Sequence, residues 1–183
     1  IGVTGVQTCA LPIYSVGITK WSTQVLKLVT SETVDSEFTA CAKDVLAMLE
    51  RISNMKDTDG FLGYGSVVYA RGELACSAII QAKIARAECC SRLGTGQLRW
   101  FHQFGTNHGS LDVVVVWDDG KKLQPVAVFE FGFVGKEKKW QVLAHASNSM
   151  WSVKKTLEQY VDVPILAVTW YLDQNKVHQG KCE

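Results

Sequence analysis

Apolar residues recur along this chain with two different periods, and each period predicts a different kind of element. Over 31–56 they return every three or four residues, which is typical of a helix with one buried face. The same spacing predicts a second helix over 72–93, followed by a glycine at position 94, and a long third helix over 136–160. In this last helix Met150, Val153 and Leu157 belong to the apolar stripe. The stretch 14–30 has a mixed pattern, and 57–65 is a glycine-rich linker.

Strands are predicted where apolar residues alternate with polar ones or run together. Residues 97–104 alternate, with His102 on one side and Gln103 on the other. The stretch 111–132 contains two apolar runs joined by the polar turn 118–122, whose Asp-Gly pair is a strong hairpin signal. A further apolar run at 165–171 follows a proline and has the composition of a buried strand. The order of elements after the linker is therefore helix, three strands, helix, strand.

Within the second strand of the hairpin, strict alternation makes a prediction about faces. It places Val126, Val128 and Gly132 on the same face as Glu130. The residues between them, Ala127, Phe129 and Phe131, are expected on the opposite face.

Composition limits the classes of protein to which this chain belongs. Of its 183 residues, 47% are hydrophobic and 20% are charged, and the net charge is +1. These are ordinary values for a globular domain, and they argue against a disordered chain or a protein that coats nucleic acid with a broadly basic surface. Any site for nucleic acid must therefore be local. No apolar run has the 18 or so residues that a membrane span requires, so we expect no membrane partner.

The first residues are unlike the rest of the chain. The segment Val3–Ile13 resembles the translation of a common sequencing adapter, so we set 1–13 apart as an artefact and expect the true N-terminus to be missing. The remainder divides into an N-terminal helical extension with its linker, 14–65, and a core domain, 66–183. The core alone is long enough to bury a full hydrophobic interior.

The cysteines form no recognisable framework. Of the six, one falls within 1–13, and the other five show no CxxC pair and no regular spacing. This usage predicts reduced thiols in a protein core and an intracellular setting.

The candidate chemistry lies in the two strands of the hairpin. Asp112 stands beside the run 113–116, and Glu130 stands between two phenylalanines. Acids are poor strand formers and costly to bury, so a pair of them in apolar strands requires a compensating cation. A metal site is one interpretation; the other is that Asp112 begins a strand and bonds to a turn. On the helix 72–93, Glu73 and Glu88 both lie along or beside the face that should meet the sheet.

This arrangement resembles the PD-(D/E)XK nuclease superfamily. Leu111-Asp112 stands for the Pro-Asp of that motif, and Glu130-Phe131-Gly132 stands for its Glu-x-Lys, with glycine at the lysine position. The Glu-Phe-Gly form, followed by a helix rich in Lys and Trp, is similar to the nuclease domain of crinkler-type effector proteins. The resemblance implies an α/β fold with a restriction-endonuclease-like αβββαβ core and an N-terminal accessory helix.

The resemblance also implies a function and roles for individual residues. It predicts hydrolysis of phosphodiester bonds with Mg²⁺ or Mn²⁺ held by Asp112, Glu130 and the carbonyl of Phe131. Lys139 on the following helix, or a neighbouring lysine, would replace the motif lysine. Glu88 is preferred to Glu73 as the acid from the first core helix, since it lies at the end that leads into the sheet.

The partner implied by the resemblance is nucleic acid, with DNA favoured over RNA. The implied setting is intracellular, and nuclear if the chain is an effector that acts in a host nucleus. The alternative is the same fold with a decayed site, serving as a module that binds nucleic acid or protein. Gly132 favours the alternative, whereas the retention of Asp112 and Glu130 favours the nuclease.

Overall fold

The chain folds into a mixed α/β structure in the computed structural model, which describes residues 10–55, 64–87, 93, 95–107, 109–134, 139–159, 161 and 163–181. In chain order the elements are α1 (Ala10–Val29), α2 (Glu32–Ser53), α3 (Tyr64–Arg86), β1 (Gln97–Thr106), β2 (Gly109–Asp118), β3 (Leu123–Phe133), α4 (Lys139–Glu158), β4 (Leu166–Leu172) and β5 (Val177–Lys181). The order helix, three strands, helix, strand is therefore confirmed from α3 to β4. In the part of the chain that the structure describes, two helices precede this series and one strand follows it.

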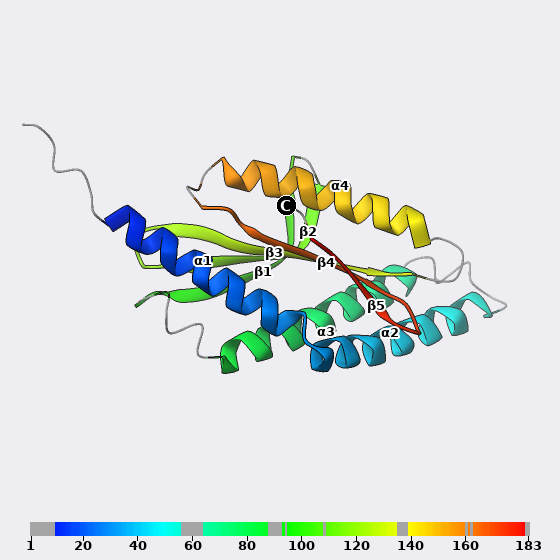
Figure 1. Ribbon diagram of the computed structural model, residues 1–183. Coiled ribbons are helices and arrows are strands. Elements are labelled where there is room, and N and C mark those ends of the chain that lie inside the picture. The colour runs from blue at the N-terminus through cyan, green and yellow to red at the C-terminus, as the bar shows by residue number, and fades with distance from the viewer. Residues whose placement is uncertain are drawn as a thin grey trace, which may run out of the picture.

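The five strands form one sheet in the order β1-β2-β3-β4-β5. Neighbouring strands are antiparallel except for β3 and β4, which are parallel. A parallel pair needs a long crossover connection, and α4 provides it. Figure 1 shows α4 on one face of the sheet and α1, α2 and α3 on the other, so the sheet is the middle layer of three.

The core lies on both faces of the sheet. The larger cluster lies between the sheet and α1 to α3, and aromatic rings form its centre. Phe131 stacks on Trp170 with ring centroids 5.3 Å apart, and Phe38 of α2 meets both rings edge-on at 5.8 and 5.4 Å. The smaller cluster lies under α4 and contains Met150 and, with it, Val153 and Leu157. The predicted apolar stripe of α4 is thus confirmed within the described residues.

Helix α2 confirms the predicted helix over 31–56, and Ser31 occupies its N-cap position with an extended backbone (φ −79°, ψ 151°).

The second predicted helix begins earlier than expected, at Tyr64 instead of residue 72. Gly72 does not start α3 but lies inside it, at a point of close packing. A Cβ added there would stand 2.6 Å from Cγ2 of Val45 and 2.7 Å from Cζ of Phe133. The glycine therefore lets α3 approach both α2 and β3.

Two elements were not predicted. Residues 14–30 form most of α1, whose buried face consists of Ile18, Trp21, Val25 and Val29. This helix begins at Ala10, inside the segment that we attributed to an adapter sequence. Strand β5 is short and mostly polar, and it pairs only with β4 at the edge of the sheet, so its sequence carries little strand pattern.

The predicted faces of β3 are right for Val128 and wrong for Val126. Val126 belongs to the larger cluster with Phe129, whereas Val128 belongs to the smaller one under α4. The reason is a shift of register between Val115 and Val116 of β2, opposite this part of β3. An irregularity of this kind reverses the alternation of side chains beyond it. A prediction from strict two-residue alternation in the sequence does not detect it.

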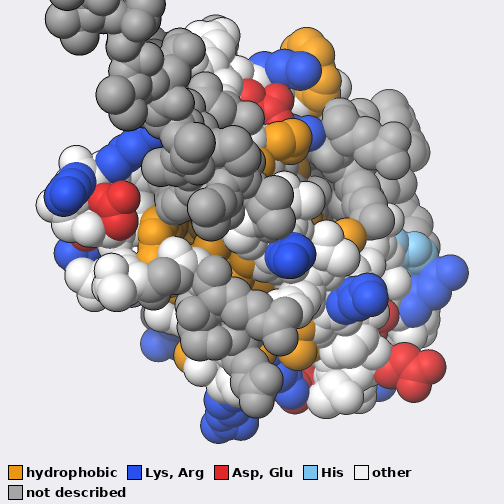
Figure 2. All heavy atoms as spheres, turned by 60° about the vertical axis from the view of Figure 1, so that its left-hand side comes forward, with side chains coloured by type: hydrophobic (Ala, Val, Ile, Leu, Met, Phe, Trp, Pro, Cys, Tyr) orange, Lys and Arg blue, Asp and Glu red, His pale blue; other side chains and the backbone are white. Residues whose placement is uncertain are grey.

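The described surface has no concentrated basic region on the face seen in Figure 2, where Lys and Arg side chains lie apart from one another. This distribution agrees with the net charge of +1. Among the described helices, we find none whose length and apolar character would allow it to cross a membrane.

Candidate metal centre

Asp112 and Glu130 converge where β2 and β3 stop pairing regularly. The ladder between the strands ends at the pair Val113 and Phe129. At the next position, Oδ2 of Asp112 accepts a hydrogen bond from the backbone N–H of Phe131 at 2.7 Å. Oε2 of Glu130 accepts one from the backbone N–H of Asp112 at 3.1 Å. Each carboxylate thus takes a backbone donor of the opposite strand, and the two acids lie together between the strands.

A third acid, Glu73 of α3, joins them through an amide. The Nε2 group of Gln103 on β1 donates to Oε2 of Glu73 and to Oδ1 of Asp112, in both cases at 3.1 Å. Glu73 directly follows Gly72, whose close packing sets the approach of α3 to the sheet. Glu88, which the sequence favoured over Glu73, lies outside the described residues.

Gln103 reaches this site because its backbone is unusual. Its φ of 50° is in the left-handed region, which residues other than glycine rarely occupy. The preceding residue, His102, also faces α3, where Nδ1 lies 3.4 Å from Oγ of Ser77. The prediction that His102 and Gln103 point to opposite sides is therefore wrong, because the left-handed residue interrupts the alternation of β1. Strain of this kind is often found at functional sites.

The pKa values of all three carboxyl groups are raised, and burial is the largest cause in each case. Burial raises the pKa of Asp112 to about 6, although hydrogen bonds from Phe131 and Gln103 oppose the change. Burial and the charge of Asp112 raise the pKa of Glu73 to about 7. Burial, together with the charges of Asp112 and Glu73, raises the pKa of Glu130 to about 8. No cationic side chain of the described residues contributes to these three pKa values.

The donor set suits a hard cation. Carboxylate oxygens are the ligands that Mg²⁺ prefers, and Mg²⁺ commonly takes only one or two carboxylates and keeps several waters. Within the described ranges, no group of three or more His, Cys, Asp or Glu side chains is placed so that it could hold a metal ion. Asp112 and Glu130 therefore fit an open site of the magnesium kind better than a closed site made only of protein ligands.

Other predicted members of the site are placed only in part. Phe131 contributes its N–H to Asp112, and the role of its carbonyl stays a prediction. Gly132 lies next to Tyr171 of β4 and offers no side chain. Lys139 is the first residue of α4, but its side chain lies outside the described atoms, as do residues 136–138.

Besides Gln103, the structure adds a second polar residue that the sequence did not single out as part of the site. Thr169 is the neighbour of Glu130 in the parallel pair of β3 and β4, so the two side chains stand on the same face of the sheet. Thr169 is 3% exposed, and its Oγ1 has no hydrogen-bond partner in the described part of the chain. A threonine in an apolar strand is a weak signal. The only available hint of its role was its position in the fourth predicted strand.

Comparison of the chain with models of protein families, with curated proteins and with solved structures gives no match. Function must therefore be inferred from the site itself.

Proposed function

We propose that this chain is a metal-dependent nuclease that hydrolyses phosphodiester bonds, with Mg²⁺ or Mn²⁺ as cofactor and DNA favoured over RNA as substrate. The observation that carries the proposal is the convergence of one buried acid, Asp112, with two partly buried acids, Glu130 and Glu73. The pKa values of Asp112, Glu130 and Glu73 are raised to about 6, 8 and 7. A dication would offset this repulsion. The order of elements from α3 to β4 also supports a restriction-endonuclease-like core, which is part of the proposal.

In this mechanism, Asp112 and Glu130 hold the cation, with the carbonyl of Phe131 as a further ligand. When bound, the metal lowers the pKa of a water molecule and offsets the charge of the phosphoryl oxygens. Gln103 fixes the distance between Glu73 and Asp112, since its single amide nitrogen donates to both. Glu73 is our choice to accept the proton of the attacking water, because the amide of Gln103 holds it beside Asp112.

The positive charge that the superfamily takes from its motif lysine must come from elsewhere in this chain. Lys139 begins α4 directly after β3 and its loop, so it is our choice for the group that contacts the scissile phosphate. The second candidate function, a binding module with a decayed site, is favoured by one observation. Gly132 stands at the motif position and supplies no charge.

The test is cleavage of single- and double-stranded DNA and RNA at fixed salt, with Mg²⁺ or with EDTA. Glu130→Gln keeps the shape of the side chain and removes its charge, so cleavage should fall by orders of magnitude, as expected when metal-assisted stabilisation of the transition state is lost. Glu50→Gln is the matched control, because it makes the same change on the exposed surface of α2 and should leave the rate unchanged.

Lys139→Ala separates the two candidate functions further. It should lower the turnover while Mg²⁺ binding is retained, because a lysine near the phosphate acts on the water or the transition state and is not a ligand. Cleavage that is equal in wild type, Glu130→Gln and Lys139→Ala would overturn the proposal. Binding of nucleic acid by a wild type that cleaves none of the substrates would favour the binding module.

A further inference from the structure

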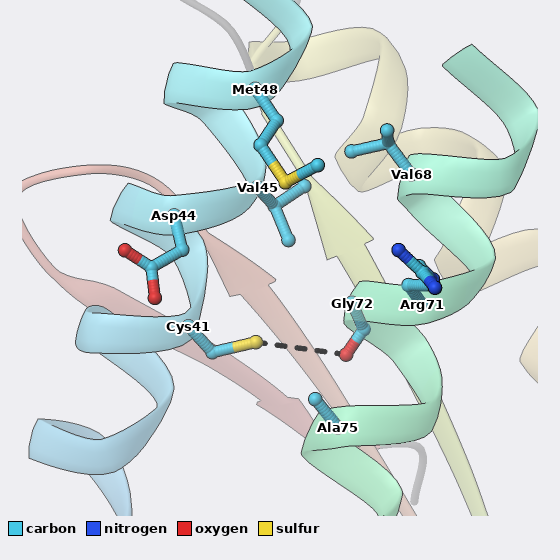
Figure 3. Close-up of a pocket in the computed structure, with 8 residues that line it drawn as sticks. All are labelled: Cys41, Asp44, Val45, Met48, Val68, Arg71, Gly72 and Ala75. Atoms are coloured by element: carbon cyan, nitrogen blue, oxygen red, sulfur yellow. Dashed lines mark hydrogen bonds between the residues drawn. The ribbon is translucent and has the colours of Figure 1, made fainter. Parts of the chain in front are cut away.

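Two cysteines face each other between α2 and α3, outside the carboxylate site. The thiol of Cys76 on α3 donates to Sγ of Cys41 on α2, and the two sulfurs are 3.8 Å apart. Cys76 is fully buried, whereas Cys41 is partly exposed. Figure 3 shows Cys41 pointing from α2 toward α3, where its Sγ lies 3.7 Å from the carbonyl oxygen of Gly72.

We propose that Cys41 and Cys76 form a peroxide-reactive dithiol site, which closes reversibly into a disulfide between α2 and α3. A disulfide has a sulfur–sulfur distance of about 2 Å, so the two sulfurs need to approach by roughly 2 Å from their present distance. Rotation about the χ1 bonds of two side chains that already hydrogen-bond to each other is the direct way to bring the sulfurs together.

The surroundings give the two thiols different roles. Cys41 lines a cavity of about 170 Å³ between the two helices, together with Met48, Val68, Arg71 and four others. Liquid water occupies about 30 Å³ per molecule, so a peroxide of similar size fits this cavity. Cys76 is closed off from solvent. The geometry therefore makes Cys41 the thiol that meets the oxidant and Cys76 the thiol that resolves the product.

The electrostatics agree with this assignment. The hydrogen bond from Cys76 holds the pKa of Cys41 below its ordinary value, against the opposing effects of burial and of Asp44. The hydrogen bond to Cys41 and burial raise the pKa of Cys76, and the charges of Asp112 and Glu73 add to the rise. The thiolate is the reactive form of cysteine, so Cys41 is the better nucleophile of the two.

The chemistry balances with hydrogen peroxide as the oxidant. The thiolate of Cys41 attacks one oxygen; the O–O bond breaks, a sulfenic acid forms, and hydroxide leaves and is protonated to water. The sulfur of Cys76 then attacks Sγ of Cys41; the S–S bond forms, the S–O bond breaks, and the hydroxyl group leaves with the thiol proton as a second water. Two thiols are oxidised by two electrons in total, and one peroxide is reduced to two waters.

The disulfide would tie together the parts of the chain on which the carboxylate site depends. Cys76 lies about one turn after Glu73 on α3. Cys41 also contacts the carbonyl oxygen of Gly72, the residue before Glu73. The proposed reaction itself is independent of the nuclease activity, because it involves neither metal nor nucleic acid.

The first experiment uses the full chain with its other cysteines replaced by serine, namely Cys9, Cys89, Cys90 and Cys182. After treatment with a small excess of hydrogen peroxide, N-ethylmaleimide blocks the remaining thiols, and peptides are mapped by mass without reduction. We expect one cross-linked pair of peptides that joins Cys41 to Cys76 with the loss of two hydrogen atoms. The melting temperature should rise by roughly 5 to 10 °C, because the bond closes a loop of about 35 residues, and dithiothreitol should reverse both changes.

Two further variants test the roles of the thiols. With Cys76→Ser added, dimedone should label a sulfenic acid at Cys41; with Cys41→Ser added, Cys76 should stay unlabelled. The same peptide map of the peroxide-treated wild-type chain, with all six cysteines present, assigns the bond even if the chain with the serine substitutions folds poorly. Alkylation of both thiols after peroxide treatment, dimedone at Cys76, or bonds from Cys41 to other cysteines would overturn the proposal.

Discussion

Replacing Glu130 by glutamine should make the metal-free protein more stable at neutral and alkaline pH. The pKa of this carboxyl is raised from 4.5 to about 8 in the folded chain, through burial and the nearby charges of Asp112 and Glu73. A raised pKa means that the folded state prefers the protonated form. The stability that comes from this proton is complete below pH 4.5 and is lost as the pH rises through about 8.

The expected magnitude follows from the same shift. One pKa unit corresponds to about 1.4 kcal/mol, so the move from 4.5 to about 8 corresponds to roughly 4 to 5 kcal/mol if it is fully expressed. Part of the repulsion is shared with the other two acids, which remain in the variant. We therefore expect a gain on the order of 2 to 4 kcal/mol above pH 8, or roughly 5 to 10 °C in melting temperature.

The assay is thermal unfolding in EDTA from pH 5 to pH 9, followed by circular dichroism. The melting temperature of Glu130→Gln should exceed that of wild type by an amount that grows with pH and levels off above pH 8. Glu50→Gln, on the exposed surface of α2, should show no such trend. Mg²⁺ should then raise the melting temperature of wild type much more than that of Glu130→Gln.

One result would refute the reasoning. If Glu130→Gln is less stable than wild type at pH 8 to 9 without metal, a positive charge of the protein already stabilises the carboxylate of Glu130. The site would then have no need of a bound cation.

Three other predictions concern packing, the N-terminus and the bridging amide. Gly72→Ala should lower the melting temperature by roughly 2 to 6 °C relative to Gly65→Ala, because its Cβ would stand 2.7 Å from Cζ of Phe133, whereas nothing lies within 4 Å at position 65. Deletion of 1–13 should change the melting temperature by less than a few degrees, since the segment resembles an adapter translation and the buried residues described for α1, Ile18 to Val29, all follow it. Gln103→Ala should move the pH midpoint of stability upward when unfolding is measured from pH 5 to pH 9, because its hydrogen bonds lower the pKa values of both carboxyl groups that it contacts.

The sequence predicted the parts of the fold that have a regular period. Helix α2, the stripe of α4 and the hairpin of β2 and β3 follow from spacing and from one Asp-Gly turn. Helix α1 was missed although its buried residues recur every three or four positions, because the adapter-like segment hid where it starts. Strand β5 depends on its pairing with β4, which no local pattern records.

The candidate site was predictable to a lesser degree. Asp112 and Glu130 were found because acids are rare in apolar strands, and the structure brings them together. The preference for Glu88 over Glu73 relied on distance along the helix. The position of Glu73 depends instead on the packing at Gly72 and on the left-handed backbone of Gln103, and neither is visible as a pattern of residue types.

The order of the strands also bears on how this protein folds. Strands β1, β2 and β3 are consecutive neighbours in the sheet, so their contacts require only short loops to close. Strand β4 meets β3 across the whole of α4, and pairings between distant segments form more slowly because their loop-closure entropy is larger. Asp112, Glu130 and Gln103 all belong to the three-strand meander, which can assemble as a local nucleus. Thr169, which arrives with β4, joins them when the crossover closes.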